Sequence, residues 1–205
     1  MIVLTNDNQT TIKKAISLKG IGIHTGKEVT LTFKPASSNN GYTFKRIDLK
    51  NKPVIEANIK YVINTDRRTF LKKDNVTIQT CEHVLAALVG LEIDNVKIEI
   101  DASEPPIMDG SSKYFIEALE SVGIKQLSEK RKEFVVRDII SYKDPKSGSE
   151  ITLIPSSEYQ ITTMVDFGTK VLGTQNATMN SIKNFKEDIS DARTFSFLHE
   201  IEMLL

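Results

Sequence analysis

The amino-acid sequence predicts an α+β protein, in which helices are segregated from antiparallel strands. Short runs of alternating apolar and polar residues fill the first third of the chain, and two segments with apolar residues at helical spacing follow them. A polar stretch then separates these elements from a second series of strand-like runs. With 205 residues, of which 40% are hydrophobic and 26% charged, the chain is long enough to bury a sizeable core.

The first third of the chain is expected to form a sheet with one irregular loop. Strands are predicted at Lys14–Leu18 and Glu28–Phe33, on either side of the glycine-rich segment Gly20–Gly26. The three glycines of this segment indicate a tight turn or a close approach of the backbone to another group. Further strands are predicted at Tyr42–Arg46 and Val76–Gln79.

The periodicity changes to that of a helix at Cys81–Leu91, where apolar residues recur at helical spacing. Thr80 is the expected N-cap of this helix. A strand is predicted at Asn95–Ile100, and a second helix is predicted at Ser112–Val122, ending at Gly123. Together with the earlier strands, these elements predict layers of strands and helices.

The polar segment Ile124–Lys132 is interpreted as a linker, which divides the chain into a first domain at residues 1–126 and a second at 127–205. The elements expected after it are strands at Phe134–Tyr142, Ile151–Ile154 and Tyr159–Asp166 and a helix at Phe197–Leu205. The two halves therefore share a layout of strands followed by a helix. Because the sequence ends inside an apolar helical pattern, we expect the second domain to be incomplete and the polypeptide to be one piece of a longer chain.

Charge, cysteine content and hydropathy exclude several classes of protein. The 27 Lys and Arg residues balance 27 Asp and Glu residues without a basic block, so nucleic acid is not an expected partner. Cys81 is the only cysteine; we expect it to be a small buried hydrophobe in a protein from a reducing compartment. Since the sequence shows neither a signal peptide nor an apolar run of about 20 residues, we expect a cytoplasmic protein without a transmembrane segment.

The adjacent residues Glu82 and His83, at the start of the first predicted helix, are the first candidates for chemistry. A neutral imidazole can bind a metal ion and a neighbouring carboxylate can take a proton from water, a combination that suits hydrolysis. In the alternative interpretation His83 fills a groove and Glu82 offsets the helix dipole. A catalytic zinc site needs three protein ligands, and the chain has only two other histidines, His24 and His199.

Structural roles are the alternative for the other residues that stand out. His24, in the glycine-rich segment, would be held by hydrogen bonds to the backbone, and Asp191 or Thr194 would cap the last predicted helix. Phe195 and Phe197 are expected in a core, and Glu104–Gly110 is expected to be a surface turn.

Five segments of the sequence occur in the order and spacing of one enzyme family. They are Gly20–Gly26, Thr80–Leu91, Ile93–Val96, Pro106–Ser111 and Ala192–Phe195. On these motifs the chain, from about Ile12 to Leu205, resembles the UDP-3-O-acyl-N-acetylglucosamine deacetylases, the zinc amidases that commit bacteria to lipid A synthesis. The resemblance implies two similar domains, each a sheet layered with helices, with the active site between them.

The resemblance also implies roles for residues at matching positions. His83 matches a zinc ligand, Glu82 matches the general base, and Thr194 matches a hydroxyl that helps to stabilise the oxyanion. The substrate-binding positions that it implies are His24, Thr65, Asp166, Phe167, Phe195, Phe197 and Ile201. Among these, Asp166 and Phe167 would hold the uridine end of the substrate.

The implied reaction is hydrolysis of the acetamide of UDP-3-O-acyl-N-acetylglucosamine, which releases acetate and frees the sugar amine. A histidine and an aspartate that complete the family's zinc site are expected beyond Leu205, so we expect the 205-residue chain alone to be inactive. In some bacteria the family is fused to a hydroxyacyl-carrier-protein dehydratase. The alternative is a truncated, non-catalytic relative that binds a sugar nucleotide or a partner protein.

Overall fold

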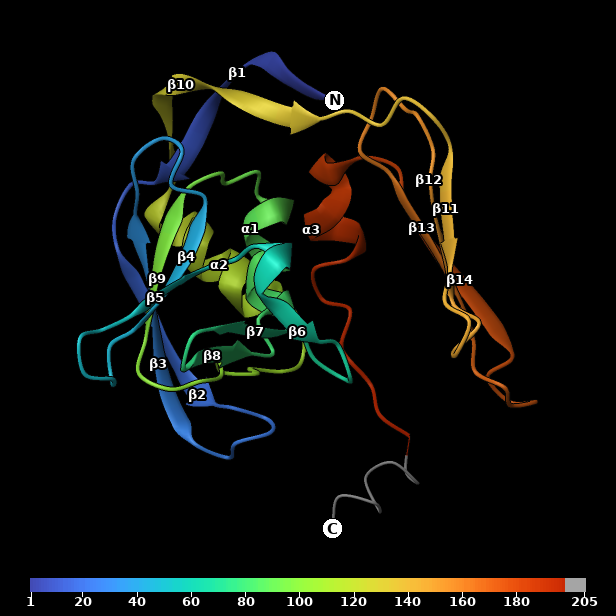
Figure 1. Cartoon of the computed structure of the whole chain (residues 1–205), viewed down its shortest axis with the longest axis horizontal. Helices are drawn as coiled ribbons and strands as arrows, with labels where there is room; N and C mark the ends of the chain where they lie inside the picture. The colour runs from blue at the N-terminus through green and yellow to red at the C-terminus, as the bar shows by residue number, and fades with distance from the viewer. Residues whose placement is uncertain (198–205) are drawn as a thin grey trace.

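The computed structural model describes residues 1–197 and confirms the α+β class (Figure 1). Its first half is built on a five-stranded sheet in the order β2, β3, β9, β4, β5. The bounds of these strands are Ile16–Ile21 for β2, Glu28–Pro35 for β3, Val96–Ile100 for β9, Tyr42–Arg46 for β4 and Val54–Glu56 for β5. Within this sheet β4 and β9 run parallel, and the other neighbours are antiparallel.

The core lies between this sheet and two helices, α1 (Glu82–Gly90) and α2 (Lys113–Val122). Both helices lie within one residue of their predicted ends. Alternate residues of β3 are buried, and the Phe33 ring packs edge-on against Phe115 of α2, with the ring centroids 6.4 Å apart. Burial of each such ring contributes about 1.5–3 kcal/mol to stability. No helix in the described part of the chain is long and apolar enough to cross a membrane.

A three-stranded antiparallel sheet leads the chain into α1. It consists of β6 (Val62–Asn64), β7 (Phe70–Lys73) and β8 (Val76–Gln79), preceded by the 3-10 turn η1 (Ile59–Tyr61). Strand β8 coincides with its prediction, whereas the residues of β6 and β7 do not alternate between apolar and polar. Because α1 begins shortly after β8, this sheet helps to set where the helix starts.

The polar segment that was expected to be a linker is a strand, so that interpretation is wrong. Strand β10 (Ile124–Phe134) pairs antiparallel with the unpredicted strand β1 (Ile2–Ile12). Arg131 of β10 donates from Nη1 to Glu92 Oε1 at 3.0 Å and from Nη2 to Asp94 Oδ2 at 3.2 Å. Since charged and polar side chains rather than an apolar face hold this strand pair, its sequence lacks the alternation that predicts a strand.

The second half contains two β-hairpins, which Figure 1 shows set apart from the core of the first half. The elements are β11 (Ile140–Lys143) with β12 (Glu150–Leu153), β13 (Ile161–Asp166) with β14 (Thr174–Met179), and the 3-10 turn η2 (Ile182–Asn184). The predicted strand Phe134–Tyr142 is wrong, because β10 ends at Phe134 and β11 begins only at Ile140. Strand β14 is unpredicted because its mostly polar residues show no apolar alternation.

The short helix α3 (Phe185–Asp188) brings the chain back to the first half. Phe185 is buried and packs against Gly90 at the end of α1, where an added Cβ atom would lie 2.6 Å from Cγ of the Phe185 ring. Lys186 Nζ forms an ion pair of 2.9 Å with Glu120 of α2. These contacts place the residues that follow α3 beside the first half of the chain.

We expect the substitution Gly90→Ala to destabilise the protein by about 1–3 kcal/mol, although alanine in a helix is ordinarily more stable than glycine by about 1 kcal/mol. The reason is that the added methyl group would overlap the Phe185 ring and displace α3. Urea unfolding followed by circular dichroism measures the change. Val89→Ala, at an exposed position of the same helix, is the control and should shift the free energy of unfolding by less than about 0.5 kcal/mol. A gain of stability in Gly90→Ala would contradict the packing of α3 on α1.

Candidate functional site

Glu82 and His83 occupy the first turn of α1, as predicted, and both side chains are half-buried. The Glu82 Oε2 atom accepts a 3.0 Å hydrogen bond from the backbone N–H of Thr69, which holds the carboxylate against the loop between β6 and β7. Ser112 Oγ donates a 3.1 Å hydrogen bond to the backbone carbonyl of His83. The pair therefore lies at a helix N-terminus that two other segments hold in place.

Thr80 does not cap α1, so that prediction is wrong. The N-cap residue is Cys81, and it makes no side-chain capping hydrogen bond. Thr80 has a φ of 54°, which is unfavourable for a β-branched residue. Its N–H donates to the Thr69 carbonyl at 3.0 Å, and its hydroxyl donates to Glu104 Oε1 at 2.8 Å. Thr80 thus has a strained backbone conformation, and its side chain is hydrogen-bonded to Glu104.

Glu104 belongs to this region, although it was not among the predicted site residues. Its side chain is buried, its Oε2 atom accepts the Thr25 N–H at 2.9 Å, and both carboxylate oxygens lie 3.2 Å from the His24 backbone nitrogen. The expectation of a surface turn at Glu104–Gly110 is therefore wrong, because Glu104, Pro105, Pro106 and Gly110 are buried and no residue of the segment is exposed. A Cβ atom at Gly22 would lie 2.5 Å from Glu104 Oε2, so a larger residue would displace the carboxylate. The glycines of this loop were the one signal of a close neighbour.

The segment that carries Thr194 is fastened along the loop before α2. The Thr194 N–H donates to the Gly110 carbonyl at 2.8 Å, and the Ser112 N–H donates to the Ser190 carbonyl at 3.0 Å. Because Ser112 also bonds the His83 carbonyl, this loop connects the two segments that carry His83 and Thr194. The Thr194 residue itself is exposed. The structure thus brings these predicted site residues into one region.

Asp109 reinforces the same loop. Its Oδ1 atom accepts hydrogen bonds from Ser111 Oγ at 2.7 Å and from the Ser111 backbone N–H at 3.1 Å. The Nε atom of Arg193 lies 3.6 Å from Asp109 Oδ2. The hydrogen bonds from Ser111, together with the weaker effect of the Arg193 charge, hold the pKa of Asp109 below its ordinary value. At neutral pH the ionised carboxylate therefore faces the residue that precedes Thr194.

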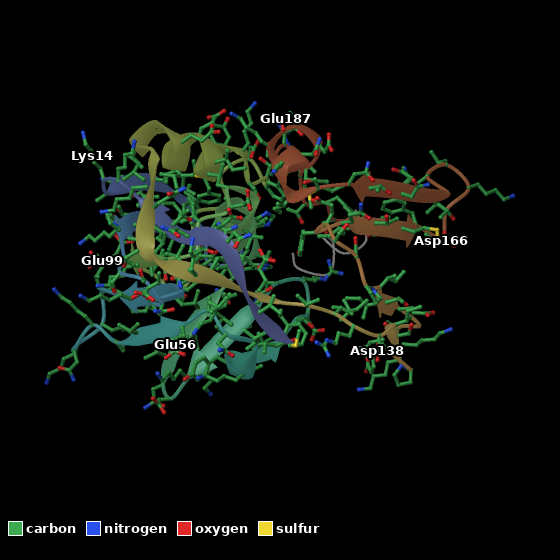
Figure 2. The ribbon with its side chains drawn as sticks, turned by 90° about the horizontal axis from the view of Figure 1, so that it is seen from above. Lys14, Glu56, Glu99, Asp138, Asp166 and Glu187 are labelled. Atoms are coloured by element: carbon green, nitrogen blue, oxygen red, sulfur yellow. The ribbon has the colours of Figure 1, made fainter. Side chains whose placement is uncertain are left out.

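Three phenylalanines that the resemblance assigns to substrate binding form one group, called here the aromatic cluster. The ring centroids are 5.2 Å apart for Phe167 and Phe195, 5.7 Å for Phe195 and Phe197, and 6.2 Å for Phe167 and Phe197. Phe195 is 62% exposed, so the expectation that it lies in a core is wrong. Asp166, at the end of β13, is exposed and accepts the Gly168 N–H at 2.9 Å (Figure 2). The cluster can offer an aromatic face to a planar ring.

The remaining predicted site residues lie on loops or outside the described residues. His24 is exposed in the glycine-rich loop, and Thr65 is exposed in the loop between β6 and β7 that contacts the first turn of α1. Ile201 and His199 lie outside the described residues, as does the predicted helix Phe197–Leu205 beyond its first residue.

The described residues do not form a complete metal site. Within residues 1–197, no group of three or more His, Cys, Asp and Glu side chains is placed to hold a metal ion. His83 is half-buried beside a carboxylate and can supply one nitrogen ligand, but a zinc site takes at least three protein ligands.

Fold and site together define an α+β protein in which a carboxylate, a histidine and a threonine are connected through neighbouring loops, the side chains from which hydrolytic sites are built. Comparison with known proteins makes the assignment specific. Residues 9–205 match the family described as LpxC, UDP-3-O-acyl N-acetylglycosamine deacetylase. The chain belongs to this family.

The relatives are longer than this chain. It is 40% identical over 198 residues to the UDP-3-O-acyl-N-acetylglucosamine deacetylase of Geotalea uraniireducens. It is 39% identical over 197 residues to the bifunctional enzyme LpxC/FabZ of Bacteroides thetaiotaomicron. Each alignment includes 96% of this chain, but 64% of the first relative and 43% of the second. The chain therefore spans less than two thirds of the length of these relatives.

We expect Cys81, the residue before Glu82, to be unreactive in the folded protein. Burial, and to a smaller extent the charge of Glu82, raises the pKa of its thiol to about 12. Because the thiolate is the reactive form, iodoacetamide at pH 8 should modify Cys81 more than about 100-fold more slowly in the native protein than in urea. Mass spectrometry gives the two rates without ambiguity, since the chain has one cysteine. Similar rates in both conditions would contradict the burial of this residue.

Proposed function

We propose that this chain carries part of the active site of a zinc-dependent deacetylase, which hydrolyses the acetamide of UDP-3-O-acyl-N-acetylglucosamine in lipid A synthesis. The observation that carries the proposal is the connection of His83 and the Thr194 segment through the loop before α2, with Glu82 next to His83 and bonded to Thr69. Family membership supports the choice of substrate. A module that only binds a ligand needs neither a general base nor an oxyanion donor.

Glu82 is the proposed general base. The Thr69 N–H fixes one of its carboxylate oxygens, so the side chain is oriented while it stays half-buried. In the reaction Glu82 takes a proton from the attacking water as the water oxygen bonds to the acetamide carbonyl carbon. The C–N bond then breaks, acetate leaves, and the sugar nitrogen takes up a proton to become the free amine.

His83 is the proposed zinc ligand from this part of the chain. When bound, zinc would polarise the amide carbonyl and lower the pKa of a water molecule. We propose that the other ligands, a histidine and an aspartate, come from beyond Leu205, which is consistent with the greater length of the relatives. The Ser112 hydroxyl supports the backbone of His83 and so helps to hold the imidazole at the helix end.

Thr194 is the proposed donor to the oxyanion. Its backbone N–H is engaged by the Gly110 carbonyl, which anchors the residue while its exposed side chain remains available to the substrate. A hydroxyl held in place before the reaction stabilises the negative charge that develops on the carbonyl oxygen. The ion pair between Arg193 and Asp109 restrains the same segment.

The nucleotide end of the substrate is proposed to bind at the aromatic cluster. The uracil ring would stack on an exposed face of the cluster, and Asp166 would accept a hydrogen bond from the uridine. The other residues of the proposed substrate-binding set are His24, Thr65 and Ile201.

The cellular setting is part of the same proposal. We place the reaction in the cytoplasm and without a nucleic-acid partner, which the balanced charge and the single cysteine support. The relatives named LpxC/FabZ combine two activities in one chain, so a fused dehydratase is a second arrangement for the full-length protein. The alternative function is a non-catalytic module that binds a sugar nucleotide or a partner protein.

In the full-length protein purified with zinc, Glu82→Gln should lower kcat for acetate release by about 10²–10⁴-fold and leave the zinc content unchanged. The amide cannot take the proton from water. His83→Ala should instead lose bound zinc, as measured by plasma emission spectrometry. Glu187→Gln, at an exposed position of α3, is the matched control and should retain the wild-type rate (Figure 2). A Glu82→Gln protein with wild-type kcat would refute the proposed base.

The 205-residue chain by itself should release no acetate, because it supplies one zinc ligand, but it should bind UDP through the aromatic cluster. Phe195→Ala should weaken that binding by about 1–3 kcal/mol, the usual contribution of base stacking. Isothermal titration calorimetry measures it, with Phe134→Ala, another exposed phenylalanine, as the control. Binding of UDP without deacetylation in the full-length protein would favour the non-catalytic alternative. Equal affinity of Phe195→Ala and wild type would exclude the aromatic cluster as the nucleotide site.

A further inference from the structure

Glu104 is a buried ionisable group that the proposed reaction does not use. Its side chain has no solvent exposure, and within residues 1–197 no Lys, Arg or His side chain forms an ion pair with it. Burial of a carboxylate without a cation is unfavourable, and only well-placed hydrogen-bond donors offset it. A neutral side chain would fold here at a lower cost. The position of the carboxylate therefore calls for a role other than stability.

Its three donors come from two segments that both carry proposed site residues. The backbone N–H groups of His24 and Thr25 belong to the glycine-rich loop, and the Thr80 hydroxyl belongs to the turn before α1. Gly22 lets the loop backbone approach the carboxylate, because the Cβ atom of a larger residue would displace Glu104 Oε2. Glu104 therefore ties the loop of His24 to the start of the helix.

The hydrogen bonds continue from Thr80 to the proposed base, Glu82. The Thr80 N–H donates to the Thr69 carbonyl at 3.0 Å, and the Thr69 N–H donates to Glu82 Oε2 at 3.0 Å. A continuous set of hydrogen bonds thus runs from His24 through Glu104, Thr80 and Thr69 to Glu82. Thr80 keeps its unfavourable φ of 54° within this set, held at the backbone by Thr69 and at the hydroxyl by Glu104.

We propose that Glu104 is a positioning residue, which fixes the loop of His24 relative to the first turn of α1 so that His24 and Glu82 act on one substrate. This inference rests on the proposed deacetylase function. The hydrogen bonds rather than the charge carry the role. The side chain of Glu104→Gln could accept both loop N–H groups through Oε1 and donate its amide to the Thr80 hydroxyl, whereas alanine would leave the buried donors without an acceptor.

The first test compares Glu104→Ala with Glu104→Gln in the full-length protein, assayed well below its melting temperature. Glu104→Ala should lower kcat/KM for deacetylation by about a hundredfold with unchanged zinc content, because the loop and the base lose their relative placement. Glu104→Gln should restore most of the activity. Glu99→Ala is the matched control, because Glu99 lies on the face of β9 that points away from the core, where it pairs with Lys34 (Figure 2).

A double-mutant cycle separates positioning from a general loss of stability. If Glu104 acts through the loop of His24, then Glu104→Ala should lower kcat/KM by less than about threefold further in a His24→Ala background. Should Glu104→Ala fail to fold, Thr80→Ala against Thr80→Ser gives the same comparison, since serine keeps the hydroxyl. Losses that multiply in the double variant, or a Glu104→Gln as inactive as Glu104→Ala, would overturn the proposal.

Amide hydrogen exchange gives a measurement that does not depend on deacetylation. The N–H groups of His24 and Thr25 should be protected in the wild type and in Glu104→Gln, and should exchange at least about tenfold faster in Glu104→Ala. If exchange follows this pattern but the wild type shows no deacetylase activity, the proposed function fails while the tie between loop and helix stands. Unchanged exchange in Glu104→Ala would overturn the tie itself.

Discussion

The residues before α1 are positioned by the buried Glu104 carboxylate. Because water cannot reach this group, its hydrogen-bond donors have to come from the protein. Two of these donors are backbone N–H groups, so the glycine-rich loop has to lie with its backbone against the carboxylate, and Gly22 allows that approach. The third donor holds Thr80 at a positive φ directly before the helix. The backbone directly before Glu82 and His83 is therefore held by hydrogen bonds to other segments, in addition to the helix propensity of the residues that follow.

The parts of the fold that were predictable from sequence are those with one buried face. Helices α1 and α2 and strand β3 alternate buried and accessible residues with the period of their element, so the sequence carries the signal. Strands β1 and β10 carry no such signal. They lie at opposite ends of the first half of the sequence, and polar contacts such as those of Arg131 hold them in place. A linker and a solvated strand have the same composition, and the long-range pairing alone distinguishes them.

The candidate site divides in the same way. Glu82 and His83 could be predicted because a carboxylate beside a histidine at the start of a helix is a pattern of neighbouring residues in the sequence. The family motifs then assigned their roles. Glu104 could not be found, because composition favours a solvated position for a lone glutamate and nothing nearby in sequence shows its donors. The expectation of a buried Phe195 was wrong for a related reason, since the burial of one ring depends on which segments the tertiary structure brings to it.

The second half depends on the first for the placement of Thr194. All residues of β11 and β12 are exposed, so the hairpins contribute little packing of their own. The chain is instead held where Phe185 fills the space that Gly90 leaves open and where Ser190 accepts the Ser112 N–H. Because these contacts are made to α1 and to the residue before α2, Thr194 is held against the first half of the chain independently of how the hairpins are packed. The position of the proposed oxyanion donor is in this sense a property of the first half of the chain.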